Sequence, residues 1–132
     1  ELGRSVGEEL LTPHRSYLPV LKEAIRSGLV KGLAHLTGGG FIDNIPRILP
    51  ANRRVVVKKN SWPVLPVFQI IQEAGKIPEL EMYRTFNMGI GMVCVVSPEK
   101  EEEFKGKLAA VGEKPYRIGW LEEGGKGVVF SS

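Results

Sequence analysis

The stretch that decides the fold is Ala34-His35-Leu36-Thr37-Gly38-Gly39-Gly40-Phe41-Ile42-Asp43-Asn44-Ile45-Pro46-Arg47. The apolar run at residues 30–36 leads into it and predicts a strand. The three glycines predict a tight turn, because glycine adopts backbone conformations that other residues avoid. Apolar residues then recur at helical spacing, and Pro46 and Pro50 limit this helix to a short one. The unit is therefore a strand, a glycine turn and a short helix.

The flanking sequence predicts further elements of both kinds. Helices are expected at residues 16–26, 64–74, 78–86 and 97–111, the last with Ser97 as its N-cap. Strands are expected at residues 53–59, 92–97, 116–121 and 127–130, with a hairpin across residues 122–126 joining the last two. This uneven order indicates an α+β fold (an α/β sandwich), in which a mixed β-sheet is covered by helices. A chain of 132 residues forms a single domain.

Composition and charge exclude several classes of protein. The chain is 42% hydrophobic, which is typical of globular domains and not of disordered chains. Eighteen Lys and Arg oppose fifteen Asp and Glu, and the acidic run at residues 99–103 lies next to Lys105 and Lys107. This interleaving predicts a solvated helix face and no nucleic-acid binding. No apolar run is long enough for a membrane span, so we expect no membrane partner.

The single cysteine, Cys94, lies in an apolar run that predicts a buried strand. Its neighbours are aliphatic, whereas a reactive thiol needs a nearby cation or helix N-terminus. We therefore interpret Cys94 as a core residue and expect a cytoplasmic protein.

The glycine turn allows two interpretations. Backbone N–H groups at a turn that opens a helix can hold a phosphate, with Thr37 adding a hydroxyl and Arg47 a guanidinium. Alternatively, the turn only lets the helix pack closely on its strand. His35 is likewise either an acid, base or phosphate donor, or a hydrogen-bonded core residue. His14 has no metal-ligand spacing to His35, so no metal site is predicted.

A second polar cluster precedes the strand at residues 92–97. Arg84, Thr85 and Asn87 stand before Gly89-Ile90-Gly91, where the backbone can approach a ligand. The alternative is that Asn87 caps the preceding helix or adopts a left-handed conformation. No pairing of a nucleophile with a base is evident in either cluster.

These two clusters carry a resemblance to a known family. His35-Leu36-Thr37-Gly38-Gly39-Gly40-Phe41, Asn44-Ile45-Pro46-Arg47 and Met82-Tyr83-Arg84-Thr85-Phe86-Asn87 together resemble aminoimidazole ribonucleotide synthetases, also called phosphoribosylformylglycinamidine cyclo-ligases. The likeness begins at Leu11-Thr12-Pro13, where His14 replaces the family's usual threonine, and extends to the strand near Trp120. It covers nearly the whole chain.

The resemblance implies a role in purine biosynthesis. In this family ATP phosphorylates the amide oxygen of formylglycinamidine ribonucleotide, and an internal nitrogen then closes the imidazole ring with loss of phosphate. Residues 1–132 would form the C-terminal domain of a two-domain enzyme and be inactive alone. The N-terminal domain, absent from this chain, would bind most of the ATP and Mg²⁺, and the full enzyme would be a homodimer.

By resemblance, one set of residues would contact the substrate or its phosphate, with His35 as a donor or a structural support. The set is Thr37, Gly38, Gly39, Gly40, Asn44, Arg47, Arg84 and Asn87. The alternative function, from a different class, is a stand-alone module that binds a phosphorylated small molecule through the triple-glycine loop.

Overall fold

The computed structural model describes residues 3–132. Its helices are α1 (Val6–Leu10), α2 (Leu18–Arg26), α3 (Gly40–Asn44), α4 (Pro66–Gly75), α5 (Glu79–Thr85) and α6 (Glu101–Ala109), with 3-10 turns η1 (Ile45–Ile48) and η2 (Pro98–Lys100). Its strands are β1 (Val30–His35), β2 (Arg53–Lys58), β3 (Met92–Val96), β4 (Gly119–Glu123) and β5 (Gly127–Ser131). The predicted α+β class is confirmed.

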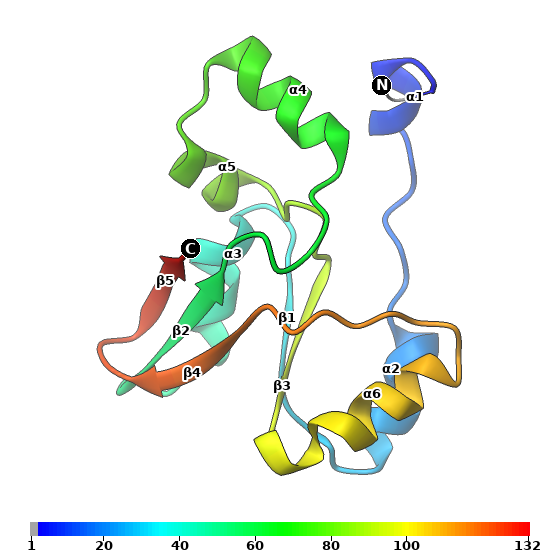
Figure 1. Ribbon diagram of the computed structural model, residues 1–132, viewed down its shortest axis with the longest axis vertical. Coiled ribbons are helices and arrows are strands. Elements are labelled where there is room, and N and C mark those ends of the chain that lie inside the picture. Colours follow the sequence, from blue (N-terminus) through cyan, green and yellow to red (C-terminus); the bar gives the residue numbers. More distant parts are fainter. Residues whose placement is uncertain (1–2) are drawn as a thin grey trace.

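The strands form two separate groups (Figure 1). One is a mixed three-stranded sheet in the order β4-β2-β5, in which β2 is antiparallel to β4 and parallel to β5. The other is an antiparallel pair, β1 with β3. The mixed sheet that the sequence predicts is present, and the β1–β3 pair stands beside it.

The predicted hairpin between the last two strands is wrong. β4 and β5 pair with opposite edges of β2, so the connection at residues 124–126 crosses the start of β2. Gly124 N–H donates to the carbonyl of Asn52 at 3.2 Å, which holds this crossing in place. The physical reason is the buried run Val55-Val56-Val57, whose backbone groups need partners on both edges.

The β1–β3 ribbon separates two hydrophobic clusters. Leu33 and Cys94 lie opposite each other in the register and pack toward α2 and α6, whose buried residues include Leu21 and Phe104. The next pair in the register, Ala34 and Val93, faces the larger cluster around Phe41, Trp62 and Met82. Successive residues of a strand point to opposite faces, so each cluster contains side chains from one face of the ribbon.

Several element ends differ from the sequence prediction. The short helix α1 was not predicted, although Ser5 and Glu8 form a capping box there. The helix predicted at residues 97–111 begins as the 3-10 turn η2, and Ser97 makes no side-chain cap hydrogen bond. The strand predicted at residues 116–121 starts at Gly119 and continues to Glu123.

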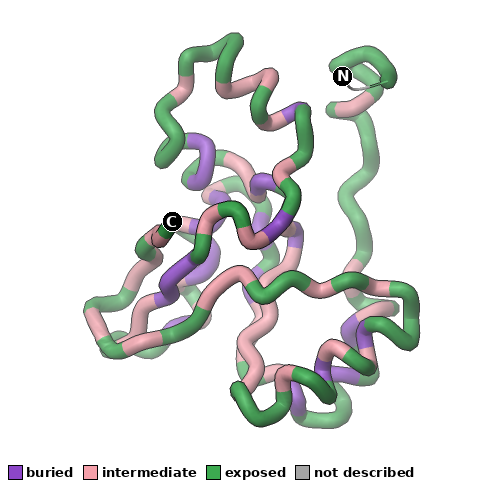
Figure 2. Tube along the Cα trace, in the orientation of Figure 1, coloured by how far each residue is buried: buried purple, intermediate pink, exposed green. Residues whose placement is uncertain are grey.

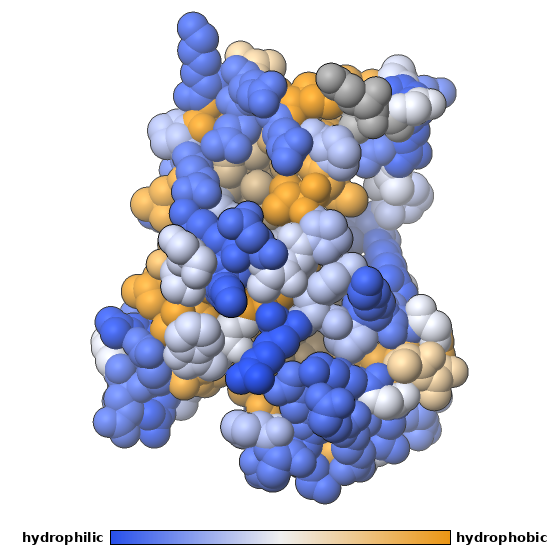
Figure 3. Space-filling model, viewed as in Figure 1, coloured by the Kyte–Doolittle hydropathy of each residue, from blue (hydrophilic) through white to orange (hydrophobic). Residues whose placement is uncertain are grey.

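Burial is concentrated at the centre of the molecule and between α2 and α6 (Figure 2). α1 and the extended segment that follows it are almost entirely exposed. Hydrophilic side chains cover the region of α6 in Figure 3, where Lys105 bridges Glu101 and Glu102. The predicted solvated face is thus confirmed. Within residues 3–132, no helix combines the length and apolar content that a membrane span requires.

Candidate functional site

The triple-glycine turn is held by contacts inside the protein. Gly39 has a φ of 100°, and Gly40 has a φ of 49°, a region that favours glycine. A Cβ on Gly40 would lie 2.6 Å from the carbonyl oxygen of Phe86 and still closer to that of Tyr83. Gly40 therefore lets α3 pack directly on the carboxyl end of α5, whereas the close-packing interpretation expected the helix to pack on its own strand.

The side chain of Asn44 stabilises the same turn through hydrogen bonds. Its side-chain amide is buried and donates to the carbonyl oxygens of Gly40 at 2.9 Å, Gly38 at 3.3 Å and Thr37 at 3.4 Å. Asn44 thus acts on the loop's shape, and its predicted contact with substrate stays a prediction.

α3 is too short to support the helix-dipole part of the phosphate argument. It spans only Gly40–Asn44 before continuing as η1. The dipole grows with the number of aligned peptide units, so five residues supply little of it. The helix dipole therefore contributes little to holding an anion at this turn.

The second loop follows α5 and is shaped by Asn87 and Met88. Asn87 Oδ1 accepts from the N–H of Gly89 at 2.9 Å, which forms a local turn. The left-handed conformation is adopted by Met88, with a φ of 50°, and by Gly89, with a φ of 93°, and not by Asn87 as one interpretation of the sequence held. Trp62 Nε1 donates to the Met88 carbonyl at 2.9 Å, so the turn is anchored in the core.

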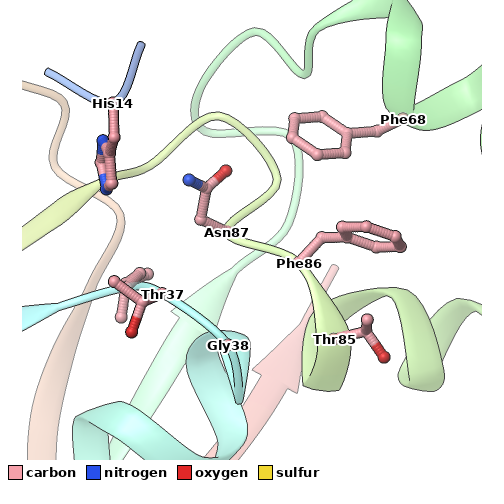
Figure 4. A pocket seen from close by; sticks show the side chains of 8 residues that line it. His14, Thr37, Gly38, Phe68, Thr85, Phe86 and Asn87 are labelled. Carbon is pink, nitrogen blue, oxygen red and sulfur yellow. The ribbon is translucent and has the colours of Figure 1, made fainter. Parts of the chain in front are cut away.

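A hollow of about 270 Å³ opens between these two loops (Figure 4). Thr37 and Gly38 from the first loop and Asn87 from the second line it, although Thr37 and Asn87 are fifty residues apart in the sequence. Phe68 and Phe86 lie on one side of Asn87, with ring centroids 5.8 Å apart, and His14 lies on the other. The hollow thus has an aromatic end and a polar end. Leu36 and Thr85 complete the lining.

His14, at the polar end, contacts a second histidine that does not itself line the hollow, and sequence reasoning did not connect the two. Nε2 of His14 and Nε2 of His35 are 2.8 Å apart. Tyr17 meets both rings edge-on, each with a centroid separation of 6.1 Å. Desolvation by burial raises the pKa of Tyr17, whose hydroxyl rests against Gly91. The segment at residues 11–17 therefore crosses the ends of β1 and β3 and brings His14 to the hollow.

The two predicted arginines lie outside the hollow's lining. Arg84 is exposed on α5, with its guanidinium 3.8 Å from Asp43 and 3.6 Å from Glu81. Arg47 is exposed on η1, seven residues past Gly40 along the helical turns, or about 10 Å at the usual rise. Of the predicted contacts, only Thr37, Gly38 and Asn87 share the hollow.

A metal centre is not formed by the described part of the chain. Among residues 3–132, no three His, Cys, Asp or Glu side chains are placed to share an ion. The carboxylate nearest the glycine turn, Asp43, faces Arg84. These donors do not form the oxygen-rich set that Mg²⁺ prefers.

The fold and site define an α+β domain in which two glycine-rich loops frame a small pocket. The chain belongs to the family described as AIR synthase related protein, C-terminal domain, whose family model matches residues 1–132. The resemblance drawn from the two loops is confirmed.

Curated relatives of this chain are named phosphoribosylformylglycinamidine cyclo-ligase. Those from Brevibacillus brevis and Thermoanaerobacter pseudethanolicus are 48% and 49% identical over 130 residues, covering 98% of this chain and 38% of each relative. One from Bacillus subtilis is 46% identical, covering 96% of this chain and 36% of the relative. The chain thus spans less than two fifths of the length of these relatives.

A solved structure shares the fold. The hydrogenase maturation protein HypE of E. coli superimposes with a TM-score of 0.67 and 20% identity, covering 89% of this chain and 37% of that one. At this identity the match supports the architecture and says nothing of the chemistry.

Proposed function

We propose that this chain is the C-terminal, substrate-contacting part of an ATP-dependent cyclo-ligase that converts formylglycinamidine ribonucleotide to aminoimidazole ribonucleotide. The observation that carries the proposal is the convergence of Thr37, Gly38 and Asn87 on one hollow, from the two motifs shared with the family. The identity to named cyclo-ligases over 98% of the chain supports it.

The two ends of the hollow suit the two ends of such a substrate. Phe68 and Phe86 offer an apolar surface to a planar amidine group and exclude water around it. At the other end, the Thr37 hydroxyl and the Asn87 amide offer hydrogen-bond donors to a phosphate or ribose oxygen. The described residues therefore bind and orient, which is the main contribution a protein makes to a ring closure.

ATP and Mg²⁺ are assigned to the N-terminal domain in this proposal. When bound, ATP supplies the phosphoryl group that makes the amide oxygen a leaving group. The ligand set for Mg²⁺ is not found among residues 3–132, and the relatives are much longer than this chain. In the full enzyme we expect a homodimer, in which this domain needs its N-terminal partner for activity.

The test is a chimera. The N-terminal part of the Bacillus subtilis relative is joined to this chain in place of its own C-terminal part, to which this chain is 46% identical. We expect ADP release that depends on formylglycinamidine ribonucleotide. A folded chimera that binds a phosphorylated sugar but releases no ADP would favour the stand-alone binding module instead.

A further inference from the structure

Helix α1 buries none of its own residues. It is five residues long, and all five stay accessible within residues 3–132. An isolated helix of this length has little stability of its own. The capping box of Ser5 with Glu8 and the ion pair of Arg4 with Glu9 satisfy the polar groups of α1 locally. What is left uncovered is therefore its apolar side.

This apolar side continues into the segment that leads to the hollow. Val6 and Leu10 are four residues apart and share one face of the helix, and Leu11 follows as the C-cap. Leu10 is 63% exposed and Leu11 is 82% exposed. His14, three residues after Leu11, lines the hollow. Exposed aliphatic side chains thus directly precede the lining of the hollow in the sequence.

The segment between α1 and α2 is fastened to the rest of the domain. The Arg15 guanidinium donates to both carboxylate oxygens of Glu113, which follows α6. Tyr17 rests on Gly91, where a Cβ would overlap its ring. Arg15 is four residues after Leu11, and four extended residues span at most about 14 Å. α1 is therefore held within a short reach of the hollow.

Helix α4 presents a second uncovered surface on the other side of the hollow. Its N-cap, Leu65, is 47% exposed, and Phe68, one turn later, lines the hollow. A separate hollow of about 320 Å³ is lined by four residues that all belong to α4: Pro66, Gln69, Ile70 and Glu73. α1 and α4 lie at the same end of the molecule in Figure 1, and hydrophobic side chains reach the surface at this end in Figure 3.

The proposed function requires a partner over the hollow. Phosphoryl transfer needs the reacting atoms within about 3.5 Å of each other, so the part of the enzyme that holds ATP has to lie over the bound substrate. Residues 3–132 contain no cluster of ligands for Mg²⁺, and a second copy of this chain would not add one. The curated relatives are much longer, since this chain covers 38% of their length. The remaining length is enough for a further domain.

We propose that the N-terminal part of the enzyme docks on the aliphatic rim of the hollow and closes it. The aliphatic rim is Val6, Leu10 and Leu11 on one side and Leu65 on the other. The inference rests on the proposed function for the identity of the partner. Docking removes these side chains from water, which stabilises both the interface and the short helix α1.

The test compares amide hydrogen exchange in the 132-residue chain and in the chimera with the Bacillus subtilis N-terminal part. Exchange at residues 6–11 should be at least about tenfold slower in the chimera, because docking stabilises α1. Residues added in front of α1 also slow exchange there by themselves, so a variant far from the junction is needed. Leu65→Gln in the chimera should speed exchange at residues 6–11 at least about threefold, because α1 and α4 share one partner.

The matched variants are Leu10→Gln and Ile25→Gln. Each replaces an exposed aliphatic residue of a helix with glutamine, which forms helices well. Ile25 lies on α2, at the opposite end of the molecule from α1 (Figure 1). Leu10→Gln should lower the urea midpoint of the chimera and leave that of the 132-residue chain unchanged. Ile25→Gln should change both midpoints equally.

The outcomes separate this inference from the proposed function. If exchange at residues 6–11 stays fast in a folded chimera, or does not respond to Leu65→Gln, the inference is overturned, and ADP release would leave the proposed function standing. It is also overturned if the 132-residue chain sediments as a dimer that Leu10→Gln dissociates, because a second copy then occupies the rim. If the rim is protected and responds to Leu65→Gln but no ADP is released, the inference stands and the proposed function fails.

Discussion

At the residue scale, the three glycines of the turn have different constraints. Gly40 has no room for a side chain beside the carbonyls of Tyr83 and Phe86, whereas a Cβ on Gly38 would meet nothing within 4 Å. Sequence alone cannot separate them, because identical residues in a row carry identical local preferences. The difference comes from α5, which lies forty residues further along the chain.

This difference predicts unequal effects of the same substitution. Gly40→Ala should destabilise the fold by about 3 kcal/mol, because the methyl group overlaps backbone atoms that cannot move away. Gly38→Ala should change stability by less than about 0.5 kcal/mol. Urea unfolding of both variants measures the two effects, and equal midpoints would show that α3 does not pack on α5 as described.

Cys94 was predicted as a core residue, and the structure places it partly buried against the cluster between α2 and α6. Burial raises the pKa of its thiol to about 11. The unfolded chain loses this proton near pH 9, so between pH 9 and pH 11 the folded state binds more protons and stability falls as pH rises.

The thiol's contribution can be isolated with Cys94→Ala. Other groups titrate in the same range, so the quantity of interest is the difference between the two proteins. We expect the free energy of unfolding to fall less from pH 9 to pH 11 in Cys94→Ala than in the original chain, as followed by urea unfolding at each pH. If the free energy of unfolding falls equally with pH in both proteins, burial does not raise the pKa of the thiol.

At the element scale, the prediction from sequence succeeds where periodicity is strong. The helix at residues 16–26 and the strands at residues 30–36 and 53–59 match α2, β1 and β2 closely. The pairing of the last two strands could not be predicted, because Gly124-Gly125 is compatible with a hairpin and with a crossing over β2. Which one forms depends on the unpaired edges of β2, a nonlocal property.

The β1–β3 ribbon predicts how the two clusters unfold. Since Leu33 and Ala34 belong to different clusters, loss of one cluster removes a face of the ribbon that the other needs. Phe104→Ala, in the α2–α6 cluster, should lower stability by about 3 kcal/mol.

The measurement follows a probe in the opposite cluster. Trp62 fluorescence, in a Trp120→Phe background, reports on the larger cluster, where Trp62 is buried. Phe104→Ala should shift its urea midpoint together with the loss of helical circular dichroism. A tryptophan midpoint that does not move would show that the clusters unfold independently.

At the scale of the whole molecule, the candidate site was predicted only in part. Thr37, Gly38 and Asn87 were identified because each lies in a glycine-rich segment with polar side chains. His14 was not, because no sequence spacing relates it to His35, and the contact arises only where residues 11–17 cross the end of β1. In the sequence, the feature that could have pointed to position 14 was the replacement of the family's usual threonine by histidine.

The central claim is that this chain holds the substrate and that ATP is bound elsewhere. Thr37→Val in the chimera tests it, because the substitution keeps the shape of the side chain and removes the hydroxyl of a residue that lines the hollow. The control is Thr12→Val, whose hydroxyl lies 3.4 Å from the Glu8 carbonyl and which is not among the residues lining the hollow.

The decisive measurement is the KM of each substrate in the Thr37→Val chimera. The account predicts that the KM for formylglycinamidine ribonucleotide rises about tenfold, with the KM for ATP within about twofold of the unchanged chimera and of Thr12→Val. A rise in the KM for ATP alone, or no change in either KM, would contradict it.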